Sequence, residues 1–307
     1  MIGLNPPLEF AGMGLHLEEC RRFWPGSPFR SLVRETARRV GVQPHALAVR
    51  VLLHLPRVAS QEGWITRREA QRELRISAQG LHDDIRVVSN HVSSKEFRLP
   101  DLIFEEIDAS RALPFLKSLH YLRSTRQGSL YFALVDPIDR LPITLCSLSP
   151  LEWQRVANQI SKQFEISPSR VWEVSRVYSV DAAPRNAISL LLSKVRKHVR
   201  CSADSADLMV TAVDPNLGFT GASYRATNWQ HWMSVRARPY MYENGRYVTP
   251  RQLRERFGTS SLVELQVKYP GRFQQSRAPL LDTMIFCGSV NGETKVVPAP
   301  ERRRLRR

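Results

Sequence analysis

Cysteines are few in this sequence, and none of them stands in a metal-binding spacing. The four, Cys20, Cys146, Cys201 and Cys287, lie far apart and form no C-x-x-C pair. Disulfide-rich scaffolds and zinc knuckles both need regularly spaced cysteines, so the sequence predicts neither. We expect buried free thiols, because an isolated cysteine behaves as a small apolar residue.

Long apolar runs are absent too. No stretch approaches the roughly 20 consecutive apolar residues that a membrane helix needs. The opening residues, MIGLNPPLEFAGMGLH, lack the basic segment followed by an apolar core that marks a signal peptide. We therefore expect a cytoplasmic protein of a bacterial or phage-infected cell. Its 307 residues suffice for two ordinary domains.

Acidic residues are scarce relative to basic ones. The chain has 29 Asp and Glu against 45 Lys and Arg, which gives a net charge of +16. Such an excess attracts polyanions, of which nucleic acid is the commonest. We expect double-stranded DNA rather than a membrane as the partner. An anionic membrane surface is the runner-up, and GC-rich genomes also raise the arginine content of proteins.

Residues 1–100 have the pattern of a helical domain. Leu32, Thr36 and Val40 recur at helical spacing, and a second such series follows the stop and restart at Gly41 and Pro44. Two stretches resemble helix-turn-helix units, RETARRVGVQPHALAVRV and ITRREAQRELRISAQGLHDDIRVV. In the second, Thr66 and Glu69 suit a helix cap and RIS suits the turn.

DNA binding by these helices is one of two open interpretations. The basic charge favours it, whereas Asp83 and Asp84 on the expected reading helix oppose it. Short helices joined by such turns are also common in proteins that never contact DNA.

From residue 101 to 290 the pattern changes to a mixture of strands and helices. We expect an α+β or α/β fold, a sheet flanked by helices. The expected strands are 102–108, 129–136, 141–149, 170–180, 206–214 and 282–290, and the expected helices are 109–122, 149–164, 186–200 and 249–258. The end, 291–307, carries ERRRLRR and is expected to be a disordered, phosphate-seeking tail.

Two short motifs place polar residues at the edges of these elements. LHYLRST puts His120 and Tyr121 at the end of a helix, and EVSR puts Glu173, Ser175 and Arg176 in a strand. Because side chains alternate along a strand, Glu173 and Ser175 share a face, which indicates either a solvent edge or a pocket. Arg176 either neutralises a phosphate or pairs with Glu173.

A third motif, APRNAIS, leads into a helix. The start of a helix offers unpaired N–H groups and a positive dipole, which suit a phosphate. Asn186 and Ser189 lie there, after Pro184. Asn186 is equally typical of an ordinary helix cap.

The fourth motif, DPNLGFTGASYRATNW, gathers an acid, a phenol and an amide around a flexible turn. Asp214 lies where a strand ends, and Gly218 and Gly221 permit a tight turn and close approach of a ligand. Tyr224 and Asn228 then follow at helical spacing, before Trp229. The alternative is that Asp214, Pro215 and the glycines simply form a loop and that Trp229 packs in the core.

The order of these elements resembles the GNAT acetyltransferase superfamily, with a tyrosine after the last strand of the core. The R-x-x-G-x-G/A loop of that superfamily is replaced by DAAPRNAI. The four motifs resemble more closely the Mom family of phage DNA-modification proteins, over roughly 102–290. Two departures stand out: Thr211, Ala212 and Val213 precede Asp214 where S-Y-A-D is usual, and Phe219 replaces a histidine.

The resemblance implies transfer of a small acyl or acetamide-type (carbamoylmethyl) group to N6 of adenine in DNA, which protects phage DNA from restriction. Asp214 would act as base or orienting acceptor and Tyr224 as proton donor to the leaving group. Ser175, Ser189 and Asn186 would supply hydrogen bonds. The expected substrate- or cofactor-binding residues are His120, Tyr121, Glu173, Arg176, Asn186, Gly218, Gly221, Asn228 and Trp229.

A flipped adenine would stack on Tyr121 or Trp229. Acetyl-CoA or another acyl-CoA is one donor, and other donors stay open. A metal stays open as well, since His120 and Asp214 are two ligand types without a diagnostic spacing. Two other functions remain alternatives: an N-acetyltransferase acting on a protein or small-molecule amine, and a non-catalytic DNA-binding protein.

Overall fold

The computed structural model describes residues 14–91, 95–202, 206–292 and 294–298. They form two compact units. Unit 1 combines the described residues up to 83 with 215–218 and 237–281, and unit 2 combines 84–214 and 219–236 with the described residues from 282 on. Whether 1–100 and 101–290 fold as separate domains stays a prediction. Most of the expected basic tail, 299–307, lies outside the described residues.

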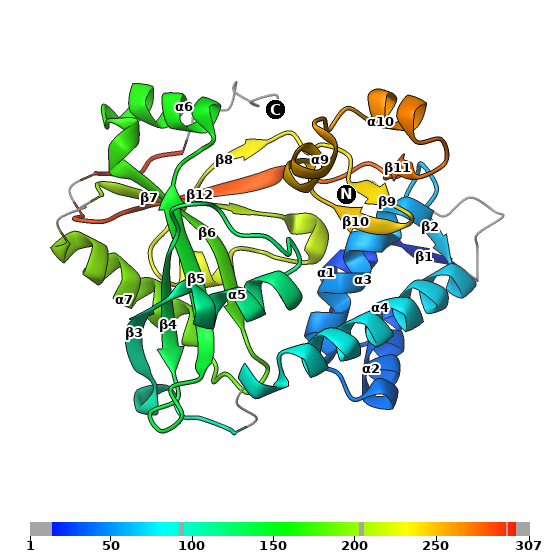
Figure 1. Ribbon diagram of the computed structural model, residues 1–307, viewed down its shortest axis with the longest axis horizontal. Coiled ribbons are helices and arrows are strands. Elements are labelled where there is room, and N and C mark those ends of the chain that lie inside the picture. The colour runs from blue at the N-terminus through cyan, green and yellow to red at the C-terminus, as the bar shows by residue number, and fades with distance from the viewer. Residues whose placement is uncertain (1–13, 92–94, 203–205, 293, 299–307) are drawn as a thin grey trace. The chain divides into compact units, whose positions relative to one another are not determined.

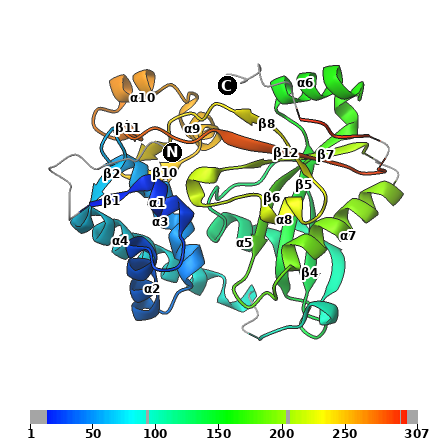
Figure 2. The ribbon, with the colours of Figure 1, turned by 180° about the vertical axis from the view of Figure 1, so that it is seen from behind.

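Unit 1 begins with four helices and two short strands, 14–16 and 64–66, that pair antiparallel although three of the helices separate them in the sequence (Figure 2). Gly41, with a φ of 73°, ends one helix, and Pro44 begins the next, as expected. The Thr66 and Glu69 cap is confirmed by reciprocal bonds of 3.0 and 3.2 Å. The elements are β1 Gly14–His16, α1 Leu17–Arg22, α2 Pro28–Val40, α3 Pro44–Val58, β2 Trp64–Thr66 and α4 Arg67–Val87.

The second expected helix-turn-helix unit is wrong, because α4 runs unbroken through the RIS segment. Its buried stripe of Ala70, Leu74, Ala78 and Leu81 continues at helical spacing on both sides of that segment. This packing outweighs the turn preference of Ser77. The first unit has the expected helices α2 and α3, but His45 is the only exposed residue of α3. DNA reading by α3 stays a prediction.

A second part of unit 1 comes from residues 237–281, where the sequence predicted only one helix. It is a three-stranded sheet with two helices around Met241, Leu253 and Phe273. The hydroxyl of Tyr242 donates to the carbonyl of Leu53 at 2.7 Å and ties this part to α3. The elements are β9 Met241–Glu243, β10 Arg246–Val248, α9 Pro250–Phe257, α10 Leu262–Lys268 and β11 Phe273–Gln275.

Unit 2 is built on a seven-stranded mixed sheet in the order β3-β4-β5-β6-β7-β12-β8 (Figure 1). Neighbouring strands are antiparallel except β6 and β7, which are parallel. The sheet confirms the predicted fold class. Its strands are β3 Ile103–Ile107, β4 Leu130–Val135, β5 Pro142–Pro150, β6 Val171–Ser179, β7 Leu208–Val213, β8 Gln230–Val235 and β12 Thr283–Ser289.

Helices cover both faces of this sheet. On one face, Phe132 of β4 lies 5.0 Å, centroid to centroid, from the ring of His198 in α7. On the other face, Tyr178 of β6 lies 6.4 Å from Phe115 in α5, and α6 packs on this same side. The helices are α5 Ala109–Ser118, α6 Gln154–Phe164, α7 Ala187–Cys201 and the single turn α8 Ala222–Arg225; short 3-10 turns are Ser89–His91, Leu99–Asp101, Pro168–Arg170 and Pro215–Leu217.

Three of the four cysteines are buried free thiols, as expected. Burial raises the pKa of Cys146 to about 12, so this thiol is protonated at neutral pH. Cys201 departs from the expectation, because it lies exposed at the last position of α7. No helix among the described residues is long and apolar enough to cross a bilayer.

Candidate active site

In the middle of the sheet, the neighbouring strands β6 and β7 diverge from one another. The two strands pair only from Val171–Leu208 to Glu173–Val210, although both continue further. At the next step the hydroxyl of Thr211 donates to the carbonyl of Val174 at 2.9 Å, in place of a ladder bond. Where parallel strands separate in this way, their backbone N–H and C=O groups need other partners, and an extended ligand can supply them.

A β-bulge lies on β6 at this same point. The register with β5 shifts from Leu148–Val174 to Ser147–Arg176, which leaves Ser175 as the extra residue. Its hydroxyl lies 2.9 Å from that of Ser147. Bulges re-aim side chains and are common beside active sites. Here the bulge brings Arg176 to the side of the sheet that also carries Glu173.

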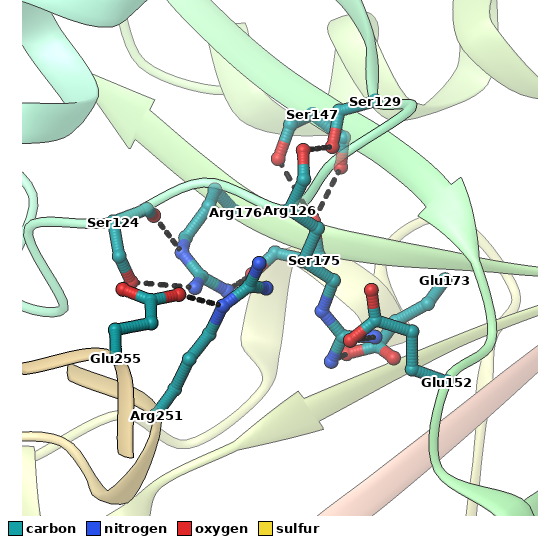
Figure 3. A network of polar contacts seen from close by, with 10 residues as sticks. All are labelled: Ser124, Arg126, Ser129, Ser147, Glu152, Glu173, Ser175, Arg176, Arg251 and Glu255. Carbon is teal, nitrogen blue, oxygen red and sulfur yellow. Dashed lines mark hydrogen bonds and ion pairs between the residues drawn. The ribbon is translucent and has the colours of Figure 1, made fainter. Parts of the chain in front are cut away.

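A buried ion pair fixes this side of the site. Arg126 donates to Glu173 at 2.8 Å, with side-chain exposures of 16% and 6%. Burial raises the pKa of Glu173 above its ordinary value, and the Arg126 charge opposes that shift. Figure 3 shows the two side chains together beside β6. Arg126 is not predictable from the sequence, because it lies 47 positions from its partner in a loop without a motif.

Arg176 clamps the same loop from the strand. Its guanidinium donates to the carbonyl oxygen of Ser124 at 2.8 Å and to the Ser124 hydroxyl at 3.2 Å (Figure 3). The ion pair of Glu173 is therefore made by Arg126, and not by Arg176 as one interpretation had it. Together these bonds join the E-x-S-R strand to the loop that follows His120 and Tyr121.

His120 is held as a neutral ring. It is 5% exposed, and its Nδ1 accepts the backbone N–H of Leu122 at 3.2 Å. Burial, followed by the charge of Arg176, lowers the pKa of His120 well below its ordinary value. The neutral ring must then carry its proton on Nε2. Tyr121 stacks on this ring at 4.6 Å and lies 5.9 Å from the ring of Phe219.

On the opposite face, Tyr224 reaches the parting of the strands from α8. Its hydroxyl lies 3.4 Å from Oγ1 of Thr211. Burial raises the pKa of Tyr224 to about 12, and Cys146 and Glu173 add to the shift. The phenol is therefore fully protonated at neutral pH.

The two glycines of the long motif have defined reasons to be glycine. Both have left-handed backbones, with φ of 79° at Gly218 and 75° at Gly221. A Cβ on Gly221 would overlap the ring of Phe286, and one on Gly218 would come within 2.9 Å of the carbonyl oxygen of Arg21. The expected tight turn is confirmed, and packing against protein accounts for both positions.

Asp214 follows the last residue of β7 and is half-buried. It is the last residue of a unit 2 segment, since the chain enters unit 1 at Pro215 and returns at Phe219. Thr211, three positions earlier, is the residue beside Tyr224.

The start of α7 contributes Asn186 and Ser189. Asn186 takes the N-cap position with a φ of 70°, but its exposed side chain makes no capping hydrogen bond. The ordinary capping role is therefore not observed. The Ser189 hydroxyl lies 3.5 Å from the carbonyl oxygen of Ser223, next to Tyr224, so α7 and α8 meet here (Figure 2).

Two expectations for the end of the motif are wrong. The helix after Gly221 is one turn long, so Tyr224 and Asn228 do not share a helical face; Asn228 is exposed with a φ of 62°. Trp229 is 1% exposed and packs against Gly288, where a Cβ would lie 2.9 Å from its ring. Trp229 is a core residue and has no free face for a base.

The site residues thus form two groups on opposite faces of the sheet. Glu173, Ser175, Arg176 and the His120 loop lie on the α5 face, and Tyr224 with Ser189 lies on the α7 face. They approach one another where β6 and β7 part. Within the described part of the chain, no three His, Cys, Asp or Glu side chains gather closely enough to hold a metal ion.

Unit 1 contains a hollow of its own. It has a volume of about 710 Å³ and is lined by β9, β10 and α9. Its carboxylates are neutralised: Glu243 pairs with Arg256 at 2.7 Å and with Arg272 at 2.5 Å, and Glu255 pairs with Arg251 at 2.8 Å.

Comparison with known proteins gives one family and a set of solved structures. A family model described as the Mom protein family matches residues 101–278, more than half of the chain. No curated protein matches.

The solved structures that match include three acetyltransferase-like proteins. NAA60 of Arabidopsis thaliana in complex with acetyl-CoA is 12% identical with a TM-score of 0.38, over 62% of this chain and 99% of that chain. The spermidine/spermine N-acetyltransferase SpeG of Vibrio cholerae, in complex with manganese ions, is 9% identical with a TM-score of 0.36, over 63% and 95%. A GNAT family acetyltransferase of Elizabethkingia anophelis with acetyl-CoA bound is 12% identical with a TM-score of 0.31, over 62% and 98%.

Proposed function

The chain belongs to the Mom protein family, and from this premise we propose that it is a transferase that modifies DNA. The acceptor is N6 of adenine, and the group added is a small acyl or acetamide-type (carbamoylmethyl) group that masks phage DNA from restriction. The family match supports a transferase of this kind, and the net charge of +16 supports a polyanionic substrate.

The observation that carries the proposal is the protonated phenol of Tyr224 at the parting of β6 and β7. Group transfer needs a proton for the leaving group at the moment its bond breaks. A tyrosine held neutral by burial retains that proton across the physiological pH range. Tyr224 is the general acid of the proposed reaction.

The acceptor side of the reaction needs a base, because the lone pair of an adenine amine is delocalised into the ring. Asp214, at the end of β7, accepts a proton from N6 as the bond from N6 to the transferred carbon forms. The bond from that carbon to the leaving group breaks, and Tyr224 protonates the leaving group.

An acyl-CoA donor fits the parted strands. Where β6 continues beyond its pairing with β7, its edge offers N–H and C=O groups that suit the amides of an extended ligand. Ser175 and the first turn of α7 are the residues that would hold it, since no side chain caps that helix. When bound, such a donor supplies an activated carbon and a thiolate leaving group.

Access to N6 requires an adenine flipped out of the duplex, with a ring to stack against it. Tyr121 is the candidate, because it is half-buried and the stack on His120, with ring centroids 4.6 Å apart, orients its ring. The burial of Trp229 removes the other residue considered for this role.

The test is direct. Plasmid DNA from cells that produce the protein is digested to nucleosides and analysed by mass spectrometry for a heavier deoxyadenosine. The mass difference names the group transferred. An unchanged nucleoside profile from soluble, folded protein, with donor present in the cell, contradicts the proposal.

An N-acetyltransferase acting on a protein or small-molecule amine makes a different prediction. It would consume acetyl-CoA without DNA, and high salt would not slow it, because counterion release penalises only binding to a polyanion. A non-catalytic DNA-binding protein would retard DNA without leaving any altered base.

A further inference from the structure

The exposed side of α4 carries a row of arginines in its first half. Arg67, Arg68, Arg72 and Arg75 are exposed, and none of them has an ion-pair partner among the described residues. We call these four residues the α4 ridge. Unpaired guanidinium groups on a rigid helix are arranged to bind anions, because each offers a planar fork of donors.

The acidic residues of the same stretch do not neutralise the ridge. Glu69 is used in the helix cap, where its carboxylate accepts the N–H of Thr66 at 3.0 Å and the hydroxyl at 2.6 Å. Glu73 is buried and pairs with Arg57 of α3 at 2.7 Å. Both carboxylates already have partners, so the four arginines of the ridge leave this segment with a net positive charge.

Asp83 and Asp84, the two acidic residues that oppose DNA binding by this region, lie further along α4. Gln79 donates to Asp83 at 2.9 Å, and Arg123 pairs with Asp84 at 2.6 Å. Asp83 is eight residues beyond Arg75, which is about 12 Å along a helix axis. The continuous helix therefore separates the ridge from these two carboxylates, whereas a turn at RIS would have placed them on a second helix.

We propose that the α4 ridge binds the sugar-phosphate backbone of duplex DNA, as a grip outside the reaction site. The choice of DNA rests on the proposed function. Arg68 and Arg75 are about 10 Å apart along the helix, and a duplex carries one charge per roughly 1.7 Å of axis, so several phosphates fall within reach. A membrane surface fits less well, because the apolar face of α4 is already buried in unit 1 and cannot insert.

The experiment compares two arginine pairs with the same spacing. The test variant is Arg68→Gln with Arg72→Gln. The matched control is Arg34→Gln with Arg38→Gln on α2, where both arginines are also exposed, four residues apart and without an ion-pair partner among the described residues. Each variant removes two positive charges, so non-specific effects of net charge are equal. Binding to a fluorescent duplex is measured across a range of KCl concentrations.

The ridge pair should lower the slope of log K against log [salt] by about 1.8, and weaken binding roughly 30-fold at 0.15 M salt, if both groups contact phosphate. The control pair should change either quantity far less. Equal effects of the two pairs, or no effect of the ridge pair, overturn the proposal. So does a loss of binding to vesicles containing 30% phosphatidylserine with unchanged DNA binding.

These measurements are made in a Tyr224→Phe background as well as in the wild type, which separates the grip from the chemistry. A ridge effect in both backgrounds, without any modified base in DNA from cells that produce the wild type, would keep the grip and remove the proposed reaction. DNA modification by the wild type, with no effect of the ridge variant on DNA binding, would keep the proposed reaction and remove the grip.

Discussion

The phenolic oxygen of Tyr224 lies 3.4 Å from Oγ1 of Thr211, the first residue of β7 beyond the ladder that joins it to β6. Thr211 also donates to the carbonyl of Val174 on β6. One threonine thus links the phenol to the strand that carries the E-x-S-R motif. Through Thr211, the long motif that contains Tyr224 therefore contacts β6 at Val174. The neighbouring residue of β6, Glu173, forms the buried ion pair with Arg126 on the α5 face.

Tyr224→Phe should remove the proposed general acid and keep the fold. The rate of base modification should fall by about 100-fold or more, the usual contribution of a positioned acid. The single long contact to Thr211 contributes little to stability, so the melting temperature should move by only a few degrees. A variant that modifies DNA at the wild-type rate removes Tyr224 from the mechanism.

Gly221→Ala should destabilise unit 2 more than an equivalent change elsewhere. The control is Gly258→Ala, which has nearly the same φ, 77° against 75°, but open space around its Cβ. We expect about 1–2 kcal/mol for the backbone conformation in both. Overlap with the Phe286 ring adds about 1–3 kcal/mol at Gly221 only. Equal losses in urea unfolding would mean that the ring gives way without cost.

The Arg126–Glu173 pair should be coupled far more strongly than a surface pair. Arg126→Met leaves a buried carboxylate alone and should cost about 3 kcal/mol. A double-mutant cycle with Glu173→Gln measures the coupling. The control cycle uses Arg98 and Asp101, an exposed pair with side-chain exposures of 85% and 40%, for which we expect under about 1 kcal/mol. Similar coupling in both cycles contradicts the assigned burial.

His120 should make the protein less stable in mild acid. Its pKa in the folded protein is below that of the unfolded chain, so below about pH 6.5 the unfolded chain binds a proton that the folded protein refuses. Stability from this group is complete above that pH, and up to about 2 kcal/mol is lost between pH 6.5 and 5.

His120→Asn should flatten that slope, because an amide oxygen can accept the Leu122 N–H and does not titrate. The control, His91→Asn at an exposed site, should keep the wild-type slope. Urea unfolding at pH 7.5, 6 and 5 provides the measurement. A wild-type slope in His120→Asn would mean that another group titrates.

The strands and helices of the sheet were predictable because their apolar residues repeat clearly. The stripe of Leu191, Val195 and Val199 in α7 is buried as its spacing indicated. The three-residue strands β9, β10 and β11 are too short to show any period. The turn predicted at RIS does not form, because the buried stripe on both sides outweighs the turn preference of one serine.

The site was less predictable, because its geometry depends on contacts between distant segments. A bulge such as that at Ser175 leaves alternation in the sequence apparently intact, and register exists only between strands. Arg126 could not be paired with Glu173 from a loop that carries no motif. Asn228 and Trp229 share the long motif with Tyr224, but α8 ends before them. Asn228 is therefore exposed beyond the end of that helix, and Trp229 lies in the core.

The central claim is that this chain alters adenine in DNA with Tyr224 as the acid. The most direct measurement is the nucleoside mass spectrum of DNA from cells producing the wild type, compared with Tyr224→Phe at the same protein level. We predict a heavier deoxyadenosine in the wild type and its near absence in the variant. Identical spectra, with only ordinary nucleosides in both, would contradict the account.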